Sequence, residues 1–375
     1  MRRCLSLAAL AASFLFLAEI QSGCGGSSNA PASGLDQRVF IAIQNSSVSS
    51  LEIADARKDQ LSTSVVSGVG SGPSLMIPGA NSTTLVFGSG DNSVSIVDNL
   101  KEALATSETS CTTGVTCVPS LPAPTESVAA STDGKFVYAA LPTTSQVSVL
   151  ALTAGPPITV TNIPATPANC ATTNNCLPGA HRIVLSHNNA KLLVFNEGLN
   201  QFEIINTSDN SVKTVTGAGL DHPSYAVFSA DDSKAYILNC GGECGGTQAS
   251  VSVLDTSALT ISQTVNVDAA TIGISDTNNL YIAGTGPNGG SATVLPLSSL
   301  TPGKPINIGN GFHQVISVFQ GKVIIGARTC STGCMSIVDP AAGSAVKLTS
   351  GGDDRLCWMD QSDSLRSGSV LVLFP

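Results

Sequence analysis

The feature that most constrains the fold of this chain is a unit of four short β-favouring runs that recurs along it. The clearest copy comprises residues 224–229, 234–239, 250–255 and 260–267. Turn residues such as Asp, Ser and Gly separate the runs, which is the pattern of an antiparallel meander. A meander repeated at a period of roughly 40–50 residues is typical of a β-propeller, in which each copy forms one blade.

Further copies of the unit predict seven blades in one domain spanning residues 36–375. The first blade lacks an inner strand at its start, and residues 355–360 (Arg-Leu-Cys-Trp-Met-Asp) have the form of one. We therefore expect residues 355–360 to complete the first blade, because a closed ring leaves no exposed strand edges. The predicted fold class is all-β: a seven-bladed β-propeller of four-stranded antiparallel blades, closed by pairing of its N- and C-terminal segments.

The first 23 residues have the features of a signal peptide. Arg2 and Arg3 precede an apolar run, residues 5–17, that is too short to span a bilayer. Ser-Gly before Cys24 resembles the end of a bacterial lipobox, so we expect Cys24 to be acylated and residues 24–35 to form a flexible tether. Gln21 stands where such motifs usually carry Leu, and ordinary secretion with a stray cysteine is the alternative.

Charge limits the partners. The formal net charge is −9, so nucleic acid and anionic headgroups are unfavourable partners. The predicted location is the cell envelope, at the outer membrane or the periplasmic side, with membrane contact only through the lipid anchor.

Several strands resemble the YVTN-type repeats of surface-layer and other extracytoplasmic bacterial β-propellers. The resemblance spans about residues 36–360 and rests on second strands such as Lys135-Phe-Val-Tyr-Ala and Lys234-Ala-Tyr-Ile-Leu-Asn, and on third strands such as Val94-Ser-Ile-Val-Asp and Met335-Ser-Ile-Val-Asp. Several turns depart from the Asp-Gly pattern of such repeats. The resemblance implies a propeller lipoprotein with a binding or scaffolding role.

Eight cysteines fall into four close pairs within loops rich in Gly, Thr and Asn: Cys111 and Cys117, Cys170 and Cys176, Cys240 and Cys244, and Cys330 and Cys334. In an exported protein this spacing predicts four local disulfides. Zinc thiolates are the alternative, although they need four converging ligands. Propeller topology places all four pairs on one face, which we call the disulfide-bearing face. Cys357 is predicted to be a buried free thiol.

Polar residues recur where the inner strands begin, at Glu126, His181, Ser224, His313 and Arg355, with His222 two residues earlier in its blade. These side chains could ring the mouth of the central channel on the disulfide-bearing face and hold a small anionic or polar ligand. Two alternatives stay open. A histidine at this point can simply hydrogen-bond a neighbouring blade, or the residues can form a metal site.

No catalytic motif stands out, since the chain has no G-x-S-x-G elbow, Walker loop, Rossmann fingerprint or H-E-x-x-H. Asp98, Asp255 and Asp339 recur at third-strand ends, which indicates turn chemistry. No cofactor or resident metal is indicated. The predicted function is binding of a protein, glycan or small ligand by a monomer. The alternative is a propeller enzyme, such as a lactonase or metal-dependent hydrolase, using Glu126, His181 and His313 in the channel.

Overall fold

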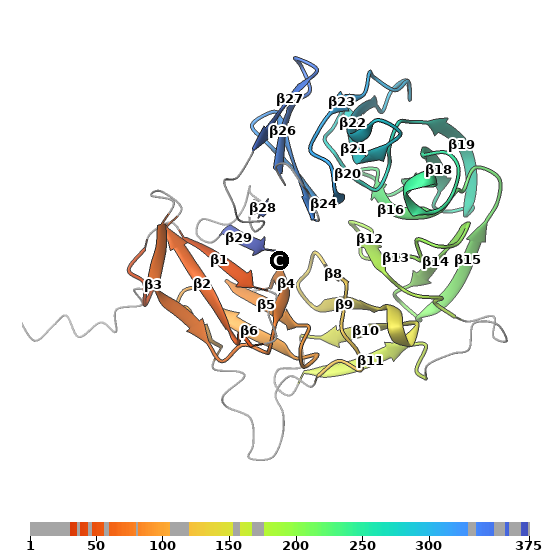
Figure 1. Ribbon diagram of the computed structural model, residues 1–375. Helices are drawn as coiled ribbons and strands as arrows, with labels where there is room; N and C mark the ends of the chain where they lie inside the picture. Colours follow the sequence, from red (N-terminus) through yellow and green to blue (C-terminus); the bar gives the residue numbers. More distant parts are fainter. Residues whose placement is uncertain are drawn as a thin grey trace, which may run out of the picture.

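The computed structural model describes residues 31–35, 38–43, 47–55, 60–79, 82–105, 120–152, 158–166, 176–328, 335–348, 357–359 and 369–373. These residues form seven small β-sheets arranged in a ring about a central axis (Figure 1). Two short 3-10 helices, η1 (Pro142–Thr144) and η2 (Gly241–Cys244), lie between second and third strands. The predicted seven-bladed β-propeller is therefore confirmed.

Blades 2 to 7 have four antiparallel strands each, and the first strand of each blade is the one nearest the channel. Blade 2 comprises β4 (Pro73–Pro78), β5 (Thr83–Gly88), β6 (Val94–Asp98) and β7 (Ala103–Leu104). Blade 3 comprises β8 (Ser127–Ala130), β9 (Phe136–Leu141), β10 (Gln146–Ala151) and β11 (Thr159–Ile163). Blade 4 comprises β12 (Arg182–Leu185), β13 (Lys191–Phe195), β14 (Gln201–Asn206) and β15 (Ser211–Thr216).

Blades 5 to 7 continue the ring. Blade 5 comprises β16 (Pro223–Phe228), β17 (Lys234–Asn239), β18 (Ser250–Asp255) and β19 (Thr260–Asn266). Blade 6 comprises β20 (Ile272–Ser275), β21 (Asn279–Gly286), β22 (Gly289–Pro296) and β23 (Ile306–Asn307). Blade 7 comprises β24 (Phe312–Phe319), β25 (Lys322–Arg328), β26 (Met335–Asp339) and β27 (Ser344–Leu348).

Blade 1 closes the ring and joins the two ends of the chain. It contains β1 (Arg38–Ile43), β2 (Ser50–Asp55) and β3 (Gln60–Ser67), together with β28 (Cys357–Met359) and β29 (Ser369–Leu373) in the order β28-β29-β1-β2-β3. Closure by the chain ends is confirmed, and residues 357–359 join this blade as expected, but they are not the strand next to β1. The partner of β1 is β29, which runs parallel to it, and β28 pairs only with β29. Two short runs at the chain end both have the residue pattern of a strand. The pattern of each run alone does not show which of the two pairs with β1.

The core lies between the blades, because neighbouring sheets pack face to face. Six clusters of buried side chains occupy the six junctions between consecutive blades, from blades 1 and 2 to blades 6 and 7. The junction of blades 4 and 5 is rich in aromatic rings, with Phe195 and Phe202 5.4 Å apart between centroids and Phe228 opposite them. Successive strand residues point to opposite faces, so each strand contributes to two junctions.

One buried carboxylate faces the junction of blades 3 and 4. Phe202 and Ile204 belong to the cluster shared with blade 5, whereas Ile205 belongs to the cluster shared with blade 3. Alternation along β14 therefore points Glu203 toward blade 3. Glu203 is 1% exposed, and its described hydrogen bond comes from Gln201 Nε2 at 2.9 Å. Burial raises the pKa of Glu203 to about 7.

The turns joining first and second strands share one design in blades 3, 4 and 5. A serine hydroxyl donates to the Asp or Asn two residues later and accepts a backbone N–H from the start of the second strand, as Ser131, Ser186 and Ser229 do. The backbone N–H of each serine donates to the carbonyl of Phe136, Lys191 and Lys234 respectively. Phe136 therefore occupies the position of the two lysines, and aligning the repeats on Lys135 is wrong by one residue.

The recurring third-strand aspartates act in turns, as predicted. Asp98, Asp255 and Asp339 each accept two backbone N–H groups, from the residues two and three positions later. In the described part of the chain no helix is long and apolar enough to cross a membrane. The expected signal peptide, residues 1–23, Cys24 and the tether up to residue 30 lie outside the described residues.

Candidate functional site

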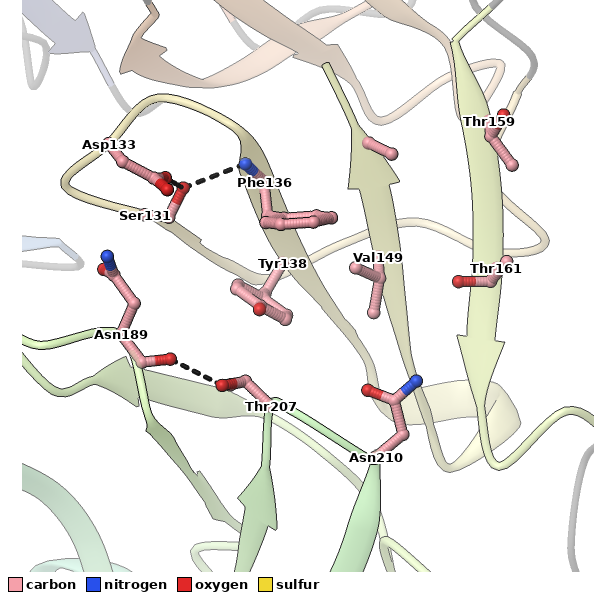
Figure 2. A pocket seen from close by; sticks show the side chains of 11 residues that line it. Ser131, Asp133, Phe136, Tyr138, Val149, Thr159, Thr161, Asn189, Thr207 and Asn210 are labelled. Atoms are coloured by element: carbon pink, nitrogen blue, oxygen red, sulfur yellow. Dashed lines mark hydrogen bonds between the residues drawn. The ribbon is translucent and has the colours of Figure 1, made fainter. Parts of the chain in front are cut away.

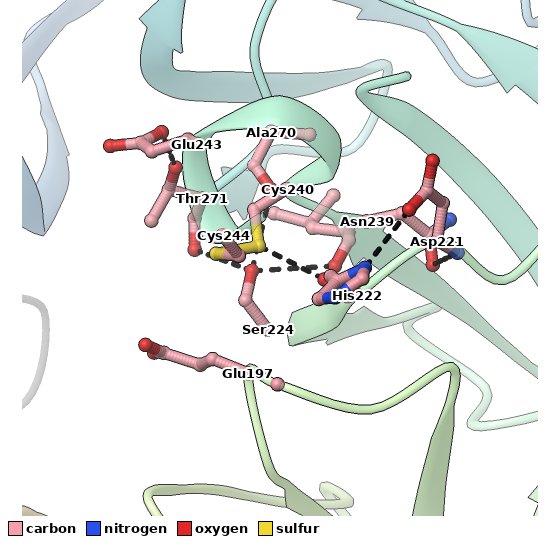
Figure 3. Close-up of a disulfide and its surroundings, with 12 residues drawn as sticks. Glu197, Asp221, His222, Ser224, Asn239, Cys240, Glu243, Cys244, Ala270 and Thr271 are labelled. Carbon is pink, nitrogen blue, oxygen red and sulfur yellow. Dashed lines mark hydrogen bonds and ion pairs between the residues drawn. A yellow bond between two sulfur atoms is a disulfide. The ribbon is translucent and has the colours of Figure 1, made fainter. Parts of the chain in front are cut away.

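The loop joining the second and third strands of blade 5 carries a disulfide. Cys240 and Cys244 are bonded, and the bond closes around the single turn of η2 (Figure 3). Gly241 begins this turn at a φ of +54°, and a Cβ there would lie 2.3 Å from the backbone of Ala249. The loop thus needs glycine to cross its own exit strand.

Asp221 holds the far side of this loop. Its carboxylate accepts the Thr247 N–H at 2.9 Å, the Thr247 hydroxyl at 2.6 Å and the Gln248 N–H at 2.8 Å. Burial alone would raise the pKa of Asp221, but these bonds and one from His222 hold it well below its ordinary value. His222 Nδ1 lies 3.0 Å from Asp221 Oδ1 (Figure 3). His222 therefore contacts Asp221, the residue that holds the disulfide loop in place.

Glu243 lies within the disulfide loop and ties it to blade 6. Its Oε2 accepts the N–H of Thr285 at 2.8 Å and the hydroxyl of Thr271. In Figure 3, Glu243 and Glu197 extend on the side of the disulfide away from Asp221. The disulfide loop thus presents one carboxylate beside the start of the blade 6 inner strand.

Arg182 crosses the channel mouth, and sequence reasoning missed it. Its Nε lies 2.6 Å from Glu197 Oε1 in its own blade, while its Nη1 donates to the Thr271 carbonyl of blade 6 at 3.0 Å. Its guanidinium carbon lies 5.3 Å from the centroid of Phe312 in blade 7. One side chain that contacts blades 4, 6 and 7 must lie inside the ring.

The guanidinium of Arg182 is incompletely satisfied. The residue is 9% exposed, and among the described residues its Nη2 has no hydrogen-bond partner. Arg38, at the junction of blades 1 and 2, differs because both of its Nη groups donate hydrogen bonds, and among the described residues only its Nε lacks a partner with hydrogen-bond geometry. It lies 2.9 Å from Glu102 through Nε, and it donates to the carbonyls of Leu35 and Asn99. A buried donor without a partner costs about 1–3 kcal/mol, and more when charged, so Arg182 is suited to an incoming acceptor.

Glu126 and His181 lie together, as their positions at inner-strand starts suggested. His181 Nδ1 is 2.8 Å from Glu126 Oε2, and both side chains are exposed. The hydrogen bond that His181 donates to the Glu126 carboxylate raises the pKa of His181, against the opposing effect of burial. This pair provides a rim group whose positive charge persists to higher pH than that of an ordinary histidine.

His313 has the contacts of the structural alternative. It is 1% exposed, and its Nε2 lies 2.9 Å from the carbonyl oxygen of Gly309. Burial lowers the pKa of His313, which favours the neutral ring. Because adjacent strand residues point to opposite faces, its ring points away from the face that Phe312 presents to Arg182. Ser224 is likewise buried, with its hydroxyl on backbone carbonyls.

Several other predicted site residues lie outside the described residues, and for one more only the backbone is described. Arg355, Cys111, Cys117, Cys170, Cys330 and Cys334 are among them, and the side chain of Cys357 is not described. Cys176 is disulfide-bonded. Within the described ranges, no group of three or more His, Cys, Asp or Glu could hold a metal ion. The residues at the channel mouth can therefore form hydrogen bonds with a ligand through both charged and neutral groups, near the aromatic ring of Phe312.

Comparisons with known proteins support the fold alone. No protein-family model matches the chain, and no curated protein matches it. Among solved structures, Kuenenia stuttgartiensis hydrazine synthase matches with a TM-score of 0.54 and 15% identity, over 72% of this chain and 76% of that one. The dihydro-heme d1 dehydrogenase NirN, in complex with DHE, matches with a TM-score of 0.58 and 12% identity, over 86% and 66%. The computationally designed protein Ika8 matches with a TM-score of 0.55 and 10% identity, over 86% and 94%.

Proposed function

We propose that the chain is an exported, lipid-anchored propeller lipoprotein of the YVTN-repeat type, which binds a small ligand at the channel mouth of its disulfide-bearing face. The observation that carries the proposal is Arg182, which is buried, spans three blades and keeps one Nη2 without a partner in the described structure. A carboxylate or phosphate group is the acceptor that matches a guanidinium. The ligand is therefore a small molecule that carries such a group.

The surroundings of Arg182 restrict this ligand further. Glu197 and Glu243 place carboxylates near the guanidinium, whereas His181 beside Glu126 supplies a partial positive charge. A ligand with both an anionic group and a cationic or hydrogen-donating group fits a mixed-charge mouth better than a simple polyanion. The disulfide loop keeps Glu243 in place, so the site is pre-organised.

Binding of zwitterionic and anionic probes tests the proposal. Glycine, aspartate, succinate and inorganic phosphate would be titrated by calorimetry and by thermal shift. At least one should bind saturably to the wild type and lose about tenfold or more in affinity in the double variant Arg182→Gln, Glu197→Gln, since a lost charged hydrogen bond is worth at least 1.4 kcal/mol. The double replacement avoids leaving one unpaired buried charge.

The matched control is Arg38→Gln, Glu102→Gln, which removes a second buried pair far from the channel mouth. This control should lower the melting temperature and leave binding unchanged. Saturable binding of none of the four probes, or equal weakening in both double variants, would overturn the channel-mouth site. Metabolic labelling with a fatty acid, lost in Cys24→Ser, tests the anchor separately.

A further inference from the structure

A recess lies between blades 3 and 4 on the face opposite the disulfides. The sheet of blade 3 forms one wall, and the turns of blade 4 that carry Asn189, Thr207 and Asn210 form the other (Figure 2). Its volume is about 300 Å³, which is at the small end of the range of about 300–1,000 Å³ for ligand pockets. Phe136 and Tyr138 project into it from the same face of β9 (Figure 2).

The floor of the recess differs from the same position in blades 5 and 7. In blade 5 the second strand begins with Lys234, which pairs in register with Asp255 at the end of the third strand, and in blade 7 Lys322 forms an ion pair with Asp339. Blade 3 carries Phe136 opposite Ala151 at this position. The aromatic ring is 37% exposed. A charged surface pair is thus replaced by an exposed ring beside a small side chain, and packing of the blade does not require that exposure.

Three polar side chains around the ring are neutral and available. Thr159 and Thr161 on β11, and the side-chain amide of Asn210, make no hydrogen bond to any residue that the structure describes. Burial and the Asp133 charge raise the pKa of Tyr138, which keeps its phenol neutral. Hydrogen bonds from Ser131 and Lys135 lower the pKa of Asp133 to about 2, and Lys135 Nζ balances its charge at 3.0 Å.

We propose that this recess is a binding site for a neutral saccharide. The negative face of an aromatic ring attracts the polarised C–H groups on one side of a sugar ring. Phe136 is the stacking platform, and Thr159, Thr161 and Asn210 exchange hydrogen bonds with the sugar hydroxyls. The acidic protein disfavours uronic acids and sulfated sugars. The site is independent of the channel mouth, which lies on the other face of the ring.

Saturation-transfer NMR followed by calorimetry tests the proposal on the mature chain. The probes are the methyl glycosides of glucose, galactose, mannose and N-acetylglucosamine, with cellotriose and chitotriose. At least one should bind saturably, and Phe136→Ala should weaken it about tenfold, the loss expected for one aromatic contact. Introducing the lysine–aspartate pair of blade 5 with Phe136→Lys, Ala151→Asp should remove binding and leave the melting temperature nearly unchanged.

Two controls make the result decisive. Lys234→Ala changes the equivalent position of blade 5 and should not alter saccharide binding. The Arg182→Gln, Glu197→Gln variant should also bind saccharide normally, which separates this site from the channel mouth. Binding of none of the six probes, or wild-type affinity in Phe136→Ala, would overturn the proposal. Binding of galacturonate in preference to every neutral probe would also overturn it.

Discussion

Blade 4 packs against blade 3 on one side and against blade 5 on the other. Both junctions carry the serine turn, but the residues that join the turns across each junction differ. Toward blade 5, Asp232 is 8% exposed, and its carboxylate accepts the His187 N–H at 3.1 Å and the Asn188 N–H at 2.8 Å. Toward blade 3, the Asn189 side chain pairs with Thr132 through two neutral bonds of 2.9 Å each, and the Thr132 hydroxyl also donates to the His187 carbonyl at 3.3 Å. The first junction is sealed at this edge by a carboxylate, and the second leaves the recess that holds Phe136.

This difference shows where a repeat protein can vary without losing its fold. The serine turn and the inward-facing positions are kept on both sides of blade 4, because the packing between blades depends on them. The contact between the turns of neighbouring blades can be strong or weak, because the packing between blades does not depend on it. A junction held by a weaker contact keeps open space, and open space between rigid walls can hold a ligand.

The largest effect is expected from Asp232→Gly. Asp232 has a φ of +55°, so glycine removes the side chain without adding backbone strain. The variant loses the bonds to the His187 N–H, the His187 ring at 2.8 Å and the Asn188 N–H. Chemical denaturation should show a loss of about 4 kcal/mol in the free energy of unfolding, since bonds to a carboxylate are worth about 1.5–3 kcal/mol each and are not fully additive. A loss below about 1 kcal/mol would contradict a sealed junction.

A second test uses the buried carboxylate of the more open junction. Because the pKa of Glu203 is about 7 in the folded protein and about 4.5 in the unfolded chain, the folded protein holds an extra proton between these values. Its contribution therefore lowers the free energy of unfolding as the pH rises from about 4.5 to about 7, by roughly 3 kcal/mol in total.

Glu203→Gln should remove this pH dependence and stabilise the protein at pH 8 by a similar amount. Denaturant midpoints measured from pH 5 to pH 8 check it. Asp209→Asn is the matched control, because Asp209 is exposed and hydrogen bonds from Ser211 lower its pKa, so its replacement should leave the profile from pH 5 to pH 8 nearly unchanged. An unchanged slope in Glu203→Gln would show that Glu203 is not the responsible group.

The smallest effect is expected from Asn189→Gly, the counterpart of Asp232→Gly in the other junction. Asn189 has a φ of +61°, so the two variants carry the same backbone change. Only two neutral bonds to Thr132 are lost, and the free energy of unfolding should fall by about 1 kcal/mol. A loss equal to that of Asp232→Gly would remove the contrast between the junctions.

The sequence predicted the ring because each blade carries its own local signals. Turn residues and alternation mark every strand, and these signals do not depend on distant partners. The closing strand was misassigned for the opposite reason. Residues 357–359 and 369–373 both read as strands, but the choice of partner for β1 depends on a contact more than three hundred residues away in the chain.

The candidate sites could be predicted only in part. Glu126 and His181 were found because both are polar at strand starts, and they do meet. Arg182 was missed because arginine is usually exposed, and only the folded ring shows that it reaches Thr271 and Phe312. Phe136 was missed because the repeats were aligned on Lys135, which hid the aromatic residue at a lysine position.

The parallel pairing of β29 with β1 has a consequence for the order of folding. A chain is synthesised from its N-terminus, so β1 is made first and β29 last, and the edge of β1 that faces β29 stays unpaired until synthesis is complete. Blades 2 to 6 can meanwhile pack against their neighbours in sequence. We expect pulsed hydrogen exchange during refolding to show protection of the β4–β23 amides before those of β29, and simultaneous protection would argue against this order. Until β29 pairs with β1, the open edge of β1 can pair with any extended segment nearby. Once in place, β29 prevents such pairing.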